Sequence, residues 1–594
     1  MKKQYLPTLL SVISILLLCC ITGCQPQRAI KNCTTFSELS DPTADTLSDW
    51  SKVPIGLNAS FASIDTRYGK SVAPDITKKS TVKLTGWKGE KLSAQIVLWT
   101  VQEVKQVECE FSEFKSPLGS LDAGIAQARF VRYVMTDEFA GGCGYRKPEN
   151  FQASLSADML DNLDCFDIPA KTVRPVWITV SIPDMVAAGD YKGKLTLFAD
   201  RKKSHELEIE LTVQDQVLPP PSQWAYHLDL WQHPSAVARA QKLKLWSDEH
   251  FEAMKPLYKM LADAGQKVIT ATINKDPWNN QCYDRYEDMI IWTKNTDGTW
   301  AYDYTFFDKW VTFMQDIGIS KMINCYSLAP WNNELCYEDK ASGKLITVKA
   351  DPGTKVFEEI WPPFLTDFVK HLKEKGWLNK TNIAMDERSP EVMQATMNLL
   401  QKVAPELGIS LADNHKSYKK YPYIKDISVA ASAKVDLEDI TARRKKGLIT
   451  TYYVCCADKF PNVFTFSNPA EATYSAWYTV AADLDGFLRW AYNSWVENPL
   501  TDSRFRTWPA GDTYVVYPDA RSSIRFERLI EGIQDAEKIR ILREKLKDTN
   551  TVESLKKLTE LNNEIAKFNT VNPEEPCGEM VSKGKLLINT LSKQ

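Results

Sequence analysis

Residues 382–390 read NIAMDERSP and place two carboxylates side by side, Asp386 and Glu387, after a short apolar run. Adjacent carboxylates can perform acid–base chemistry when burial and the neighbouring like charge raise the pKa of one of them. The alternative is a solvated turn or the first turn of a helix, where acidic side chains interact favourably with the helix dipole. The secondary structure predicted around Asp386 and Glu387 distinguishes between these two interpretations.

The chemistry of an adjacent pair differs from that of separated carboxylates. Most glycosidases place two carboxylates on opposite sides of the scissile bond, roughly 5 Å or about 6.5–9.5 Å apart, and neighbouring residues do not easily flank a sugar in this way. An adjacent pair suits a substrate-assisted route, in which the sugar's own 2-acetamido oxygen attacks C1. In this hypothesis Glu387 is the general acid and then the base, and Asp386 accepts a hydrogen bond from the acetamido N–H.

Short apolar strands alternate with helical patterns through the second part of the chain. Eight β-then-α units predict a (β/α)8, TIM-like barrel over residues 222–545. A doubly wound open sheet is the alternative, but the sequence contains no G-x-G-x-x-G or Walker loop in support of it. The predicted strands are residues 225–231, 267–273, 320–327, 382–386, 408–413, 426–430, 447–454 and 484–490. The predicted helices are residues 249–265, 303–318, 357–377, 390–405, a short piece near Tyr418, 437–447, 471–483 and 522–548.

The strand pattern predicts which side chains face the inside of this barrel. In the fourth strand, Ile383 and Met385 should face the helices, so Asp386 is the last inward residue and Glu387 begins the loop above it. Active sites of such barrels lie at the carboxyl ends of the strands. The pair is therefore predicted at the catalytic rim.

The same face counting gives a set of candidate substrate-binding residues, each of which is equally compatible with packing in the core. Together they form a rim rich in aromatic and amide groups, which suits a neutral, hydroxyl-rich ligand such as a sugar. The predicted set is His227, Asp229, Trp231, Asn274, Tyr326, Asn414, Tyr452, Trp490, Asn493 and Trp495.

The first part of the chain has the pattern of an all-β domain. Residues 205–216, HELEIELTVQDQ, alternate apolar and acidic side chains, and several short strands with turn signals predict a β-sandwich over residues 51–217. Pro219 to Pro221 form a stiff linker and mark the domain boundary. Residues 546–594 are predicted to be a separate C-terminal helical segment.

The first residues predict export and lipid attachment. Lys2 and Lys3 precede an apolar run through Leu18, so residues 1–23 have the pattern of a signal peptide. Residues 21–24, ITGC, resemble a bacterial lipobox, which predicts lipidation of Cys24, a spacer over residues 24–50, and an extracytoplasmic, lipid-anchored protein of the periplasm or outer membrane. The alternatives are a plain signal peptide or a membrane anchor.

Composition restricts the partners and cofactors. The 73 basic and 76 acidic residues give a net charge of −3, which argues against a nucleic-acid partner. Ten cysteines follow Cys24 without a C-x-x-C pair, and there are six histidines, so we expect no metal and no organic cofactor. The pairing of these cysteines does not follow from the sequence. The 18 tryptophans fit either a sugar site or a large core.

Five segments carry a resemblance to a known family: the MDE context of residues 385–387, HLDLWQHP, GFLRWAYNSW, GDTYVVYP and RFERLIEGIQDAEKIR. Over most of its length the chain resembles glycoside hydrolase family 123, whose members are retaining β-N-acetylgalactosaminidases with an N-terminal β-sandwich. The later motifs also occur in a broader set of related barrel proteins, so they support the barrel more firmly than the sugar.

The resemblance implies a retaining exo-β-N-acetylgalactosaminidase that acts on glycans with a terminal β-linked N-acetylhexosamine. It also implies that Asp386 orients the acetamido group and that Glu387 is the acid/base. Two alternatives remain at this point. One is a hydrolase of another β-hexosaminide or of a neutral glycoside, and the other is a non-catalytic glycan-binding lipoprotein.

Overall fold

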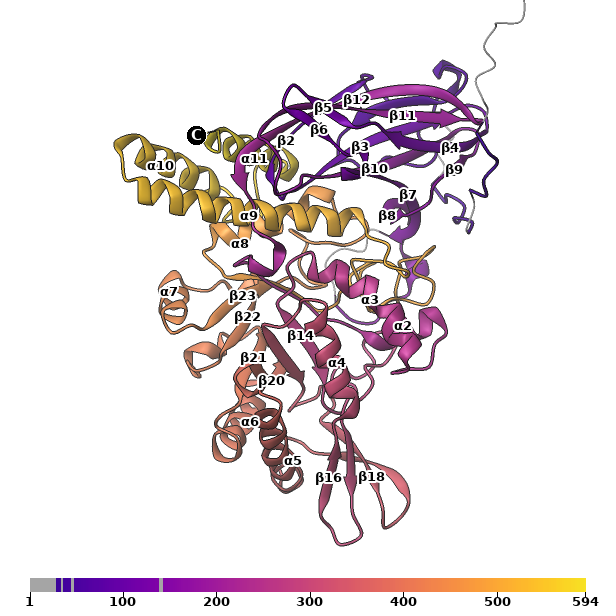
Figure 1. The fold of residues 1–594 in the computed structure, drawn as a ribbon. Helices are drawn as coiled ribbons and strands as arrows, with labels where there is room; N and C mark the ends of the chain where they lie inside the picture. Colours follow the sequence, from indigo (N-terminus) through magenta and orange to yellow (C-terminus); the bar gives the residue numbers. More distant parts are fainter. Residues whose placement is uncertain (1–27, 34–35, 44–47, 138–142, 594) are drawn as a thin grey trace, which may run out of the picture.

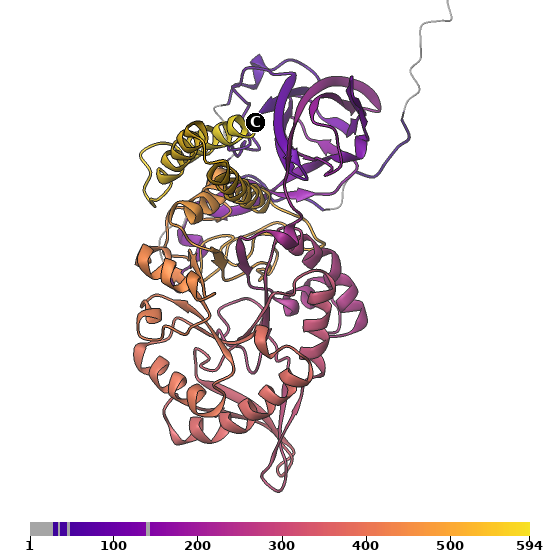
Figure 2. The same cartoon turned by 60° about the vertical axis from the view of Figure 1, so that its left-hand side comes forward.

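The computed structural model describes residues 28–33, 36–43, 48–137 and 143–593. An N-terminal β-rich domain lies against a larger domain that is built around a parallel barrel, and the C-terminal helices lie along one side of the boundary between them (Figures 1 and 2). The predicted signal peptide and Cys24 fall outside the described residues. Within the described ranges, no helix combines the length and apolar character that crossing a membrane requires.

The β-rich domain consists of two sheets that enclose a common apolar core. The first sheet has the order β1 (Asn58–Ala62), β3 (Lys91–Thr100), β10 (Thr172–Ser181), β7 (Ala126–Asp137) and β8 (Ala153–Asp161). The second has the order β2 (Thr81–Lys88), β12 (Lys202–Val217), β11 (Gly189–Ala199), β4 (Val104–Phe111) and β9 (Phe166–Ile168), with the short strands β5 (Phe114–Ser116) and β6 (Gly119–Leu121) beside it.

The period-two pattern of residues 205–216 is realised in β12. Leu207, Ile209 and Leu211 are buried in the shared core, whereas Glu208 and Glu210 lie on the other face, where both carboxylates pair with Lys192 of β11. A strand with one apolar and one charged face must place the apolar face against the second sheet. The alternation thus accounts for the two-layer arrangement.

Eight parallel strands form the barrel of the larger domain. Their hydrogen-bonded order is β13 (His227–Leu230), β24 (Gly486–Arg489), β23 (Ile449–Tyr453), β22 (Asp426–Ala430), β21 (Gly408–Asp413), β20 (Thr381–Asp386), β17 (Met322–Tyr326) and β14 (Val268–Thr272). Between the two end strands, a parallel bridge joins Leu228 to Gln266, and the Lys267 N–H donates to the Leu228 carbonyl over 3.0 Å. The ring is therefore nearly closed. All eight strands agree with the sequence prediction.

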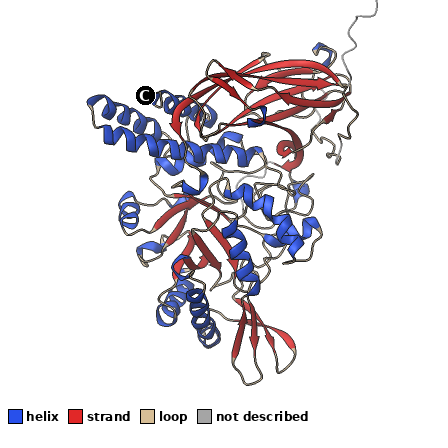
Figure 3. Ribbon diagram, in the orientation of Figure 1, coloured by secondary structure: helices blue, strands red, loops and turns tan. Residues whose placement is uncertain are grey.

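Helices surround this barrel (Figure 3). The β21–β22 connection carries a short 3-10 helix, η6 (Ser417–Lys419), at the position where only a short piece was predicted. The α-helices of the larger domain are α2 (Pro234–Gln241), α3 (Asp248–Ala262), α4 (Thr305–Asp316), α5 (Lys355–Glu374), α6 (Pro390–Val403), α7 (Leu437–Lys445), α8 (Pro469–Ala481) and α9 (Ile524–Thr549).

A small sheet that is not among the predicted elements projects from the barrel (Figure 1). Its strands are β15 (Ile291–Lys294) and β16 (Trp300–Asp303), inserted after β14, and β18 (Glu334–Asp339) and β19 (Lys344–Lys349), inserted after β17. The order β16-β15-β18-β19 joins the two insertions edge to edge. These connections follow the carboxyl ends of the strands, so the insertion lies on the predicted catalytic side.

The C-terminal helices join the two domains and do not form a separate tail. Helix α9 runs through the predicted boundary at residue 545, and α10 (Val552–Ala566) and α11 (Cys577–Leu591) follow it. The indole of Trp87 in β2 donates to the hydroxyl of Ser592 over 2.9 Å, and Lys538 of α9 forms a buried ion pair with Glu90 at 3.0 Å. Leu561 and Ile565 of α10 and Ile588 and Leu591 of α11 are buried in the large core, so these helices pack onto the rest of the protein.

Candidate active site

Asp386 is the last residue of β20, and its strand places it as predicted. Ile383 and Met385 are fully buried in the large core that contains the surrounding helices, whereas Ala384 belongs to the inner cluster of the barrel. Immediately after the pair, the Ser389 side chain accepts a hydrogen bond from the Val392 N–H and caps α6. The acidic pair therefore precedes the first turn of α6, at the carboxyl end of the barrel.

The backbone turns sharply at Glu387. Neighbouring residues of a strand point to opposite faces, so regular alternation would direct Glu387 away from Asp386. Instead Glu387 has a φ of 45°, in the left-handed region, and its N–H donates to the Ala412 carbonyl of β21 over 2.9 Å. Both carboxylates consequently line one cavity. A non-glycine residue is uncommon in this region, and the hydrogen bond to Ala412 helps to hold Glu387 there.

Two tryptophans hold the carboxylate of Asp386. The indole N–H groups of Trp278 and Trp331 donate to its Oδ2 over 3.0 and 3.1 Å. Within the described ranges, Oδ1 accepts no hydrogen bond and remains available to a donor in the cavity. Burial and then the charge of Glu387 raise the pKa of Asp386 to about 7, although the two indoles and Arg388 act in the opposite direction.

Glu387 has a different partner. The hydroxyl of Tyr453, the last residue of β23, donates a hydrogen bond to its Oε1. Burial and the negative charge of Glu387 raise the pKa of Tyr453, so the phenol stays protonated and acts as a donor. The two carboxylates are thus held by separate donors, indoles for Asp386 and a phenol for Glu387.

The cavity that contains the pair has a volume of about 140 Å³ and lies above the inner face of the barrel. Its floor includes the small residue Ala412 of β21, which leaves room above the strand ends. Asp386 and Glu387 are the only carboxylates among its described lining residues. The other lining residues are Cys143, Trp231, Gln281, Trp331, Ala412, Tyr453, Cys455, Cys456, Leu488, Trp490 and Trp508.

Of the predicted substrate-binding residues, Trp231 and Trp490 line this cavity. Trp231 is buried, with its ring 4.9 Å from that of Trp278. Trp490 is held by a hydrogen bond from its indole to Asp512 over 3.1 Å. Tyr326 lies beneath them, fully buried, with its ring 5.0 Å from that of Trp278. Tyr326 therefore supports the aromatic wall without lining the cavity.

The structure places His227 and Asp229 inside the barrel, below the cavity. Nε2 of His227 lies 3.8 Å from Oδ1 of Asp426, which belongs to the amino-terminal end of β22. Burial and the charge of Asp426 raise the pKa of Asp229 well above its usual value. Both side chains face inward as predicted, but the strand ends above them separate them from the cavity lining.

Asn274 and Asn493 fix loops and do not line the cavity. Asn274 exchanges two hydrogen bonds of 2.8 Å with the backbone of Cys336, which ties the inserted sheet to the barrel. Asn493 accepts from the His233 N–H and donates to the His233 carbonyl, both over 3.0 Å. Amides buried in this way satisfy backbone groups that would otherwise lack partners.

Three further predicted residues also lie away from the cavity. The indole of Trp495 donates to the Val516 carbonyl over 2.7 Å in the large core. Tyr452 faces the helices, where its hydroxyl donates to the Ser475 carbonyl over 2.8 Å, since its neighbour Tyr453 takes the inward position. Asn414 is exposed on the loop after β21 and is absent from the cavity lining.

The predicted set lacks Trp278, Trp331 and Tyr453, although the face counting that gave the set also points to Trp331 and Tyr453. Trp278 and Trp331 lie in the connections after β14 and β17, and Tyr453 ends β23. Their sequence positions could have identified them, because each residue follows or ends a predicted barrel strand at the carboxyl side of the barrel. Choosing between Tyr452 and Tyr453 required the register of β23, in which Tyr452 pairs with Val429 and Tyr453 with Ala430.

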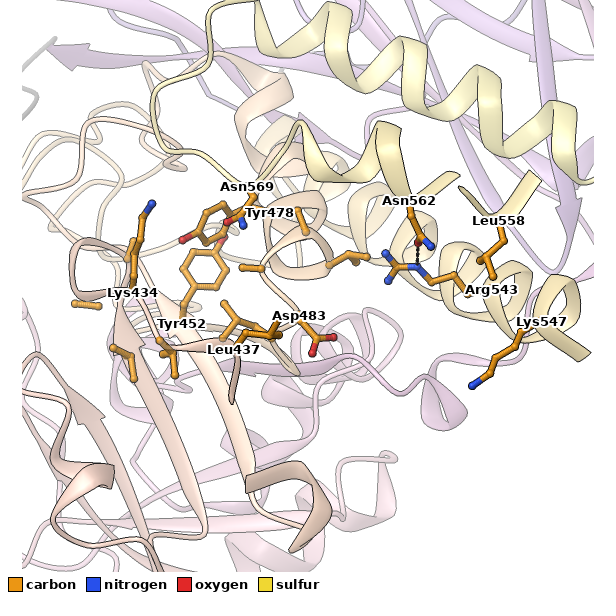
Figure 4. A pocket seen from close by; sticks show the side chains of 18 residues that line it. Lys434, Leu437, Tyr452, Tyr478, Asp483, Arg543, Lys547, Leu558, Asn562 and Asn569 are labelled. Atoms are coloured by element: carbon orange, nitrogen blue, oxygen red, sulfur yellow. Dashed lines mark hydrogen bonds between the residues drawn. The ribbon is translucent and has the colours of Figure 1, made fainter. Parts of the chain in front are cut away.

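A larger groove of about 630 Å³ lies outside the barrel, between the β22–α7 region and helices α8, α9 and α10 (Figure 4). Tyr452 and Tyr478 line one part of it and Arg543 and Lys547 another. Its one described carboxylate, Asp483, is paired with Arg444 at 2.9 Å. The described lining of the groove therefore lacks a pair of free acids, so the smaller cavity at the barrel rim is the stronger candidate for the active site.

A parallel barrel with an acid pair at its carboxyl rim, set among tryptophans, defines the class of a carbohydrate-cleaving enzyme. Comparison with known families agrees. Residues 231–542 match the model of the glycoside hydrolase 123 catalytic domain, and residues 61–199 match that of the glycoside hydrolase 123 N-terminal domain. The chain belongs to glycoside hydrolase family 123 and is a glycoside hydrolase, as the resemblance implied.

A solved structure supports the assignment. One match is a family 123 glycoside hydrolase from Clostridium perfringens, described in a study of glycolipid glycan hydrolysis. Its sequence is 30% identical and the TM-score is 0.80. The match covers 90% of this chain and 97% of the Clostridium perfringens chain. A Bacteroides ovatus GH5 xyloglucanase in complex with a XXXG heptasaccharide is 10% identical with a TM-score of 0.27, over 80% of this chain and 100% of that one. None of the curated protein sequences compared with the chain matches it significantly.

Proposed function

We propose that the protein is a retaining exo-β-N-acetylgalactosaminidase that cleaves by substrate-assisted catalysis. The observation that carries this proposal is the composition of the cavity. Asp386 and Glu387 are the only carboxylates among its described lining residues, so the described lining offers no third acid as a protein nucleophile. A sugar whose own 2-acetamido oxygen attacks C1 needs none.

The hydrogen-bond donors around Asp386 and Glu387 support a different role for each carboxylate. Oδ2 of Asp386 is occupied by two indoles, and Oδ1 is left to accept the acetamido N–H. Glu387 protonates the leaving oxygen while the acetamido oxygen forms its bond to C1, which gives an oxazolinium-like intermediate. Glu387 then takes a proton from the water that opens this intermediate. Two displacements at C1 retain the configuration.

The size of the cavity favours action at chain ends. Its 140 Å³ is small beside the roughly 300–1,000 Å³ of pockets for drug-sized ligands. A single sugar ring, packed against tryptophan faces, suits this volume better than an internal segment of a glycan. The choice of N-acetylgalactosamine rests on the family, and the Clostridium perfringens relative concerns a glycolipid glycan.

We also infer that the architecture is a β-sandwich followed by a (β/α)8 barrel, since two core-sharing sheets precede eight parallel strands with helical connections. Lipidation at Cys24 and an extracytoplasmic location are proposals that rest on residues 1–24 alone. Cys24→Ser is expected to move the protein from the membrane fraction to the soluble fraction. Unchanged fractionation would contradict the anchor.

The direct test is turnover on a panel of aryl β-glycosides of N-acetylgalactosamine, N-acetylglucosamine and the corresponding neutral sugars. We expect the N-acetylgalactosaminide to be cleaved fastest and the neutral sugars, which lack the acetamido group, not to be cleaved. A thiazoline inhibitor should compete with the substrate, because it mimics the cyclised intermediate. Equal turnover of the neutral glycosides would exclude the substrate-assisted route.

A further inference from the structure

A disulfide bond between the two domains forms part of the cavity wall. Cys143 belongs to the connection between β7 and β8 of the β-rich domain, and Cys456 follows β23 of the barrel. The two residues are 313 positions apart, and both line the cavity that contains Asp386 and Glu387. The β-rich domain therefore contributes directly to the site.

The same connection also holds a second part of the wall. The Arg146 N–H donates to the Arg506 carbonyl over 2.6 Å, and its guanidinium donates to the Trp508 carbonyl over 3.1 Å. Trp508 lines the cavity, and its indole donates to the Gln281 carbonyl over 3.0 Å. Residues 143–146 thus fix both a cysteine and a tryptophan of the wall.

Further contacts place the end of β7 on the catalytic face of the barrel. The hydroxyls of Thr136 and Thr465 lie 2.7 Å apart, and the Ser503 N–H donates to the Met135 carbonyl over 2.8 Å. Thr465 lies between β23 and α8, and Ser503 follows β24. These are connections at the carboxyl ends of two strands, on the same side of the barrel as the acid pair.

We propose that the Cys143–Cys456 disulfide closes the cavity on the side of the β-rich domain and thereby restricts the enzyme to terminal sugars. This inference rests on the proposed function and adds the structural element that determines it. A 2-acetamido sugar that carries another sugar on its ring hydroxyls needs an opening in the wall for that substituent. The covalent bond between the domains prevents the wall from separating there.

The free thiol of the neighbouring Cys455 does not readily exchange with the Cys143–Cys456 disulfide. Cys455 also lines the cavity, and the sulfur atoms of Cys143, Cys455 and Cys456 lie within 4.8 Å of one another. Burial raises the pKa of the Cys455 thiol to about 12. Exchange needs a thiolate, so Cys455 rarely attacks the disulfide near neutral pH. Because two of the three sulfurs are bonded, the group does not offer a three-thiolate metal site.

The chain contains its own matched control. A second disulfide, Cys33–Cys165, joins two residues of the N-terminal region and does not contribute to the cavity lining. The double variant Cys143→Ser/Cys456→Ser removes the wall crosslink, and Cys33→Ser/Cys165→Ser removes a crosslink elsewhere. Each is compared with the wild type on an aryl β-N-acetylgalactosaminide and on the same glycoside capped by a second sugar at its 4-hydroxyl.

We expect Cys143→Ser/Cys456→Ser to raise kcat/KM for the capped glycoside, relative to the uncapped one, at least tenfold. Cys33→Ser/Cys165→Ser should keep the wild-type ratio. Melting temperatures measured alongside separate this effect from stability, because a purely structural crosslink would lower Tm and leave the ratio unchanged. A ratio within twofold of wild type for both variants overturns the inference while leaving the proposed function intact.

A second measurement tests the inference if the double variant Cys143→Ser/Cys456→Ser folds poorly. Cys33→Ser/Cys165→Ser retains Cys143–Cys456, so treating this purified protein with a small dithiol reports on the wall crosslink, whose Cys143 is exposed. The same rise in the ratio is expected, and no rise in the fully reduced protein overturns the inference. A wild type that cleaves no uncapped aryl glycoside contradicts the proposed function itself, and the inference with it.

Discussion

The indole N–H of Trp278 donates to Oδ2 of Asp386 over 3.0 Å, across 108 positions of sequence. Trp331 donates to the same oxygen, so two neutral donors stabilise one carboxylate in the cavity at the barrel rim. Without them, burial and the charge of Glu387 would raise the pKa of Asp386 beyond about 7. The tryptophans thus affect the pH at which this acid becomes charged, in addition to forming the wall.

A pH dependence follows from this arrangement. If Asp386 must be ionised to accept the acetamido N–H, kcat/KM should rise with pH through an apparent pKa of about 7. Trp331→Phe removes one donor to the carboxylate, so the rising limb should move to higher pH. Trp508→Phe alters the cavity wall without touching Asp386 and should leave the midpoint in place. Identical midpoints in both variants would contradict the role of the indole.

The raised pKa of Asp386 also has a consequence for stability. A folded-state pKa above the unfolded value means that ionisation destabilises the fold, beginning above pH 3.8 and reaching its full effect above pH 7. The full shift corresponds to about 4 kcal/mol at most, and the partial exposure of the Asp386 side chain reduces this value. Asp386→Asn should therefore gain stability relative to wild type between pH 4 and pH 8, as measured by denaturant unfolding. A difference that is independent of pH would contradict this.

Asp386→Asn should at the same time lose activity. Without the negative charge, the acetamido group is oriented poorly, so kcat on 2-acetamido glycosides should fall by about 10²–10⁴-fold. Steady-state kinetics at pH 8 would measure this loss. An effect confined to KM would count against the orienting role.

Glu387 is predicted to carry the proton transfers. Glu387→Gln removes the acid and should lower kcat by about 10²–10⁴-fold on substrates whose leaving group needs protonation. Glu391→Gln is the matched control, since Glu391 is exposed in the first turn of α6. An aryl glycoside with a very acidic leaving phenol should lose less activity in the first step. Equal loss for all leaving groups would be inconsistent with an acid role.

Tyr453 and Tyr452 allow a comparison of neighbouring residues on opposite faces. Tyr453→Phe removes the hydrogen bond to Glu387 and should lower kcat/KM by about 10–100-fold, the usual range for a bond to a charged group. Tyr452→Phe removes a bond to the Ser475 carbonyl and should cost about 1 kcal/mol of stability with kcat/KM unchanged. The reverse pattern would show that the register of β23 is misassigned.

Asn493 is expected to act on stability. It pairs with both backbone groups of His233, so Asn493→Ala leaves a buried N–H and a carbonyl unpaired and should cost about 2–3 kcal/mol. KM for the aryl glycoside should not change. Asn414→Ala, on an exposed loop, should alter neither quantity. A raised KM with normal unfolding in Asn493→Ala would restore its predicted role in binding.

The sequence alone determined the faces of the strands and hence the place of the acid pair. A period of two in residues 382–386 directs Ile383 and Met385 to the helices and Asp386 inward, because a strand buries its apolar face against its neighbours. The motifs around Trp231 and Trp490 likewise located part of the cavity wall. Such signals are local and can be read from neighbouring residues.

The tertiary structure decided which side chains complete the site. Tyr453 reaches Glu387 across 66 positions, Trp331 reaches Asp386 across 55, and Cys143 reaches Cys456 across 313. These contacts depend on the stagger of the barrel strands, on the two inserted hairpins and on the packing of the β-rich domain against the barrel. The left-handed turn at Glu387 is likewise held by a bond to Ala412 in the next strand. No local periodicity encodes such contacts, because they form only when distant segments are brought together.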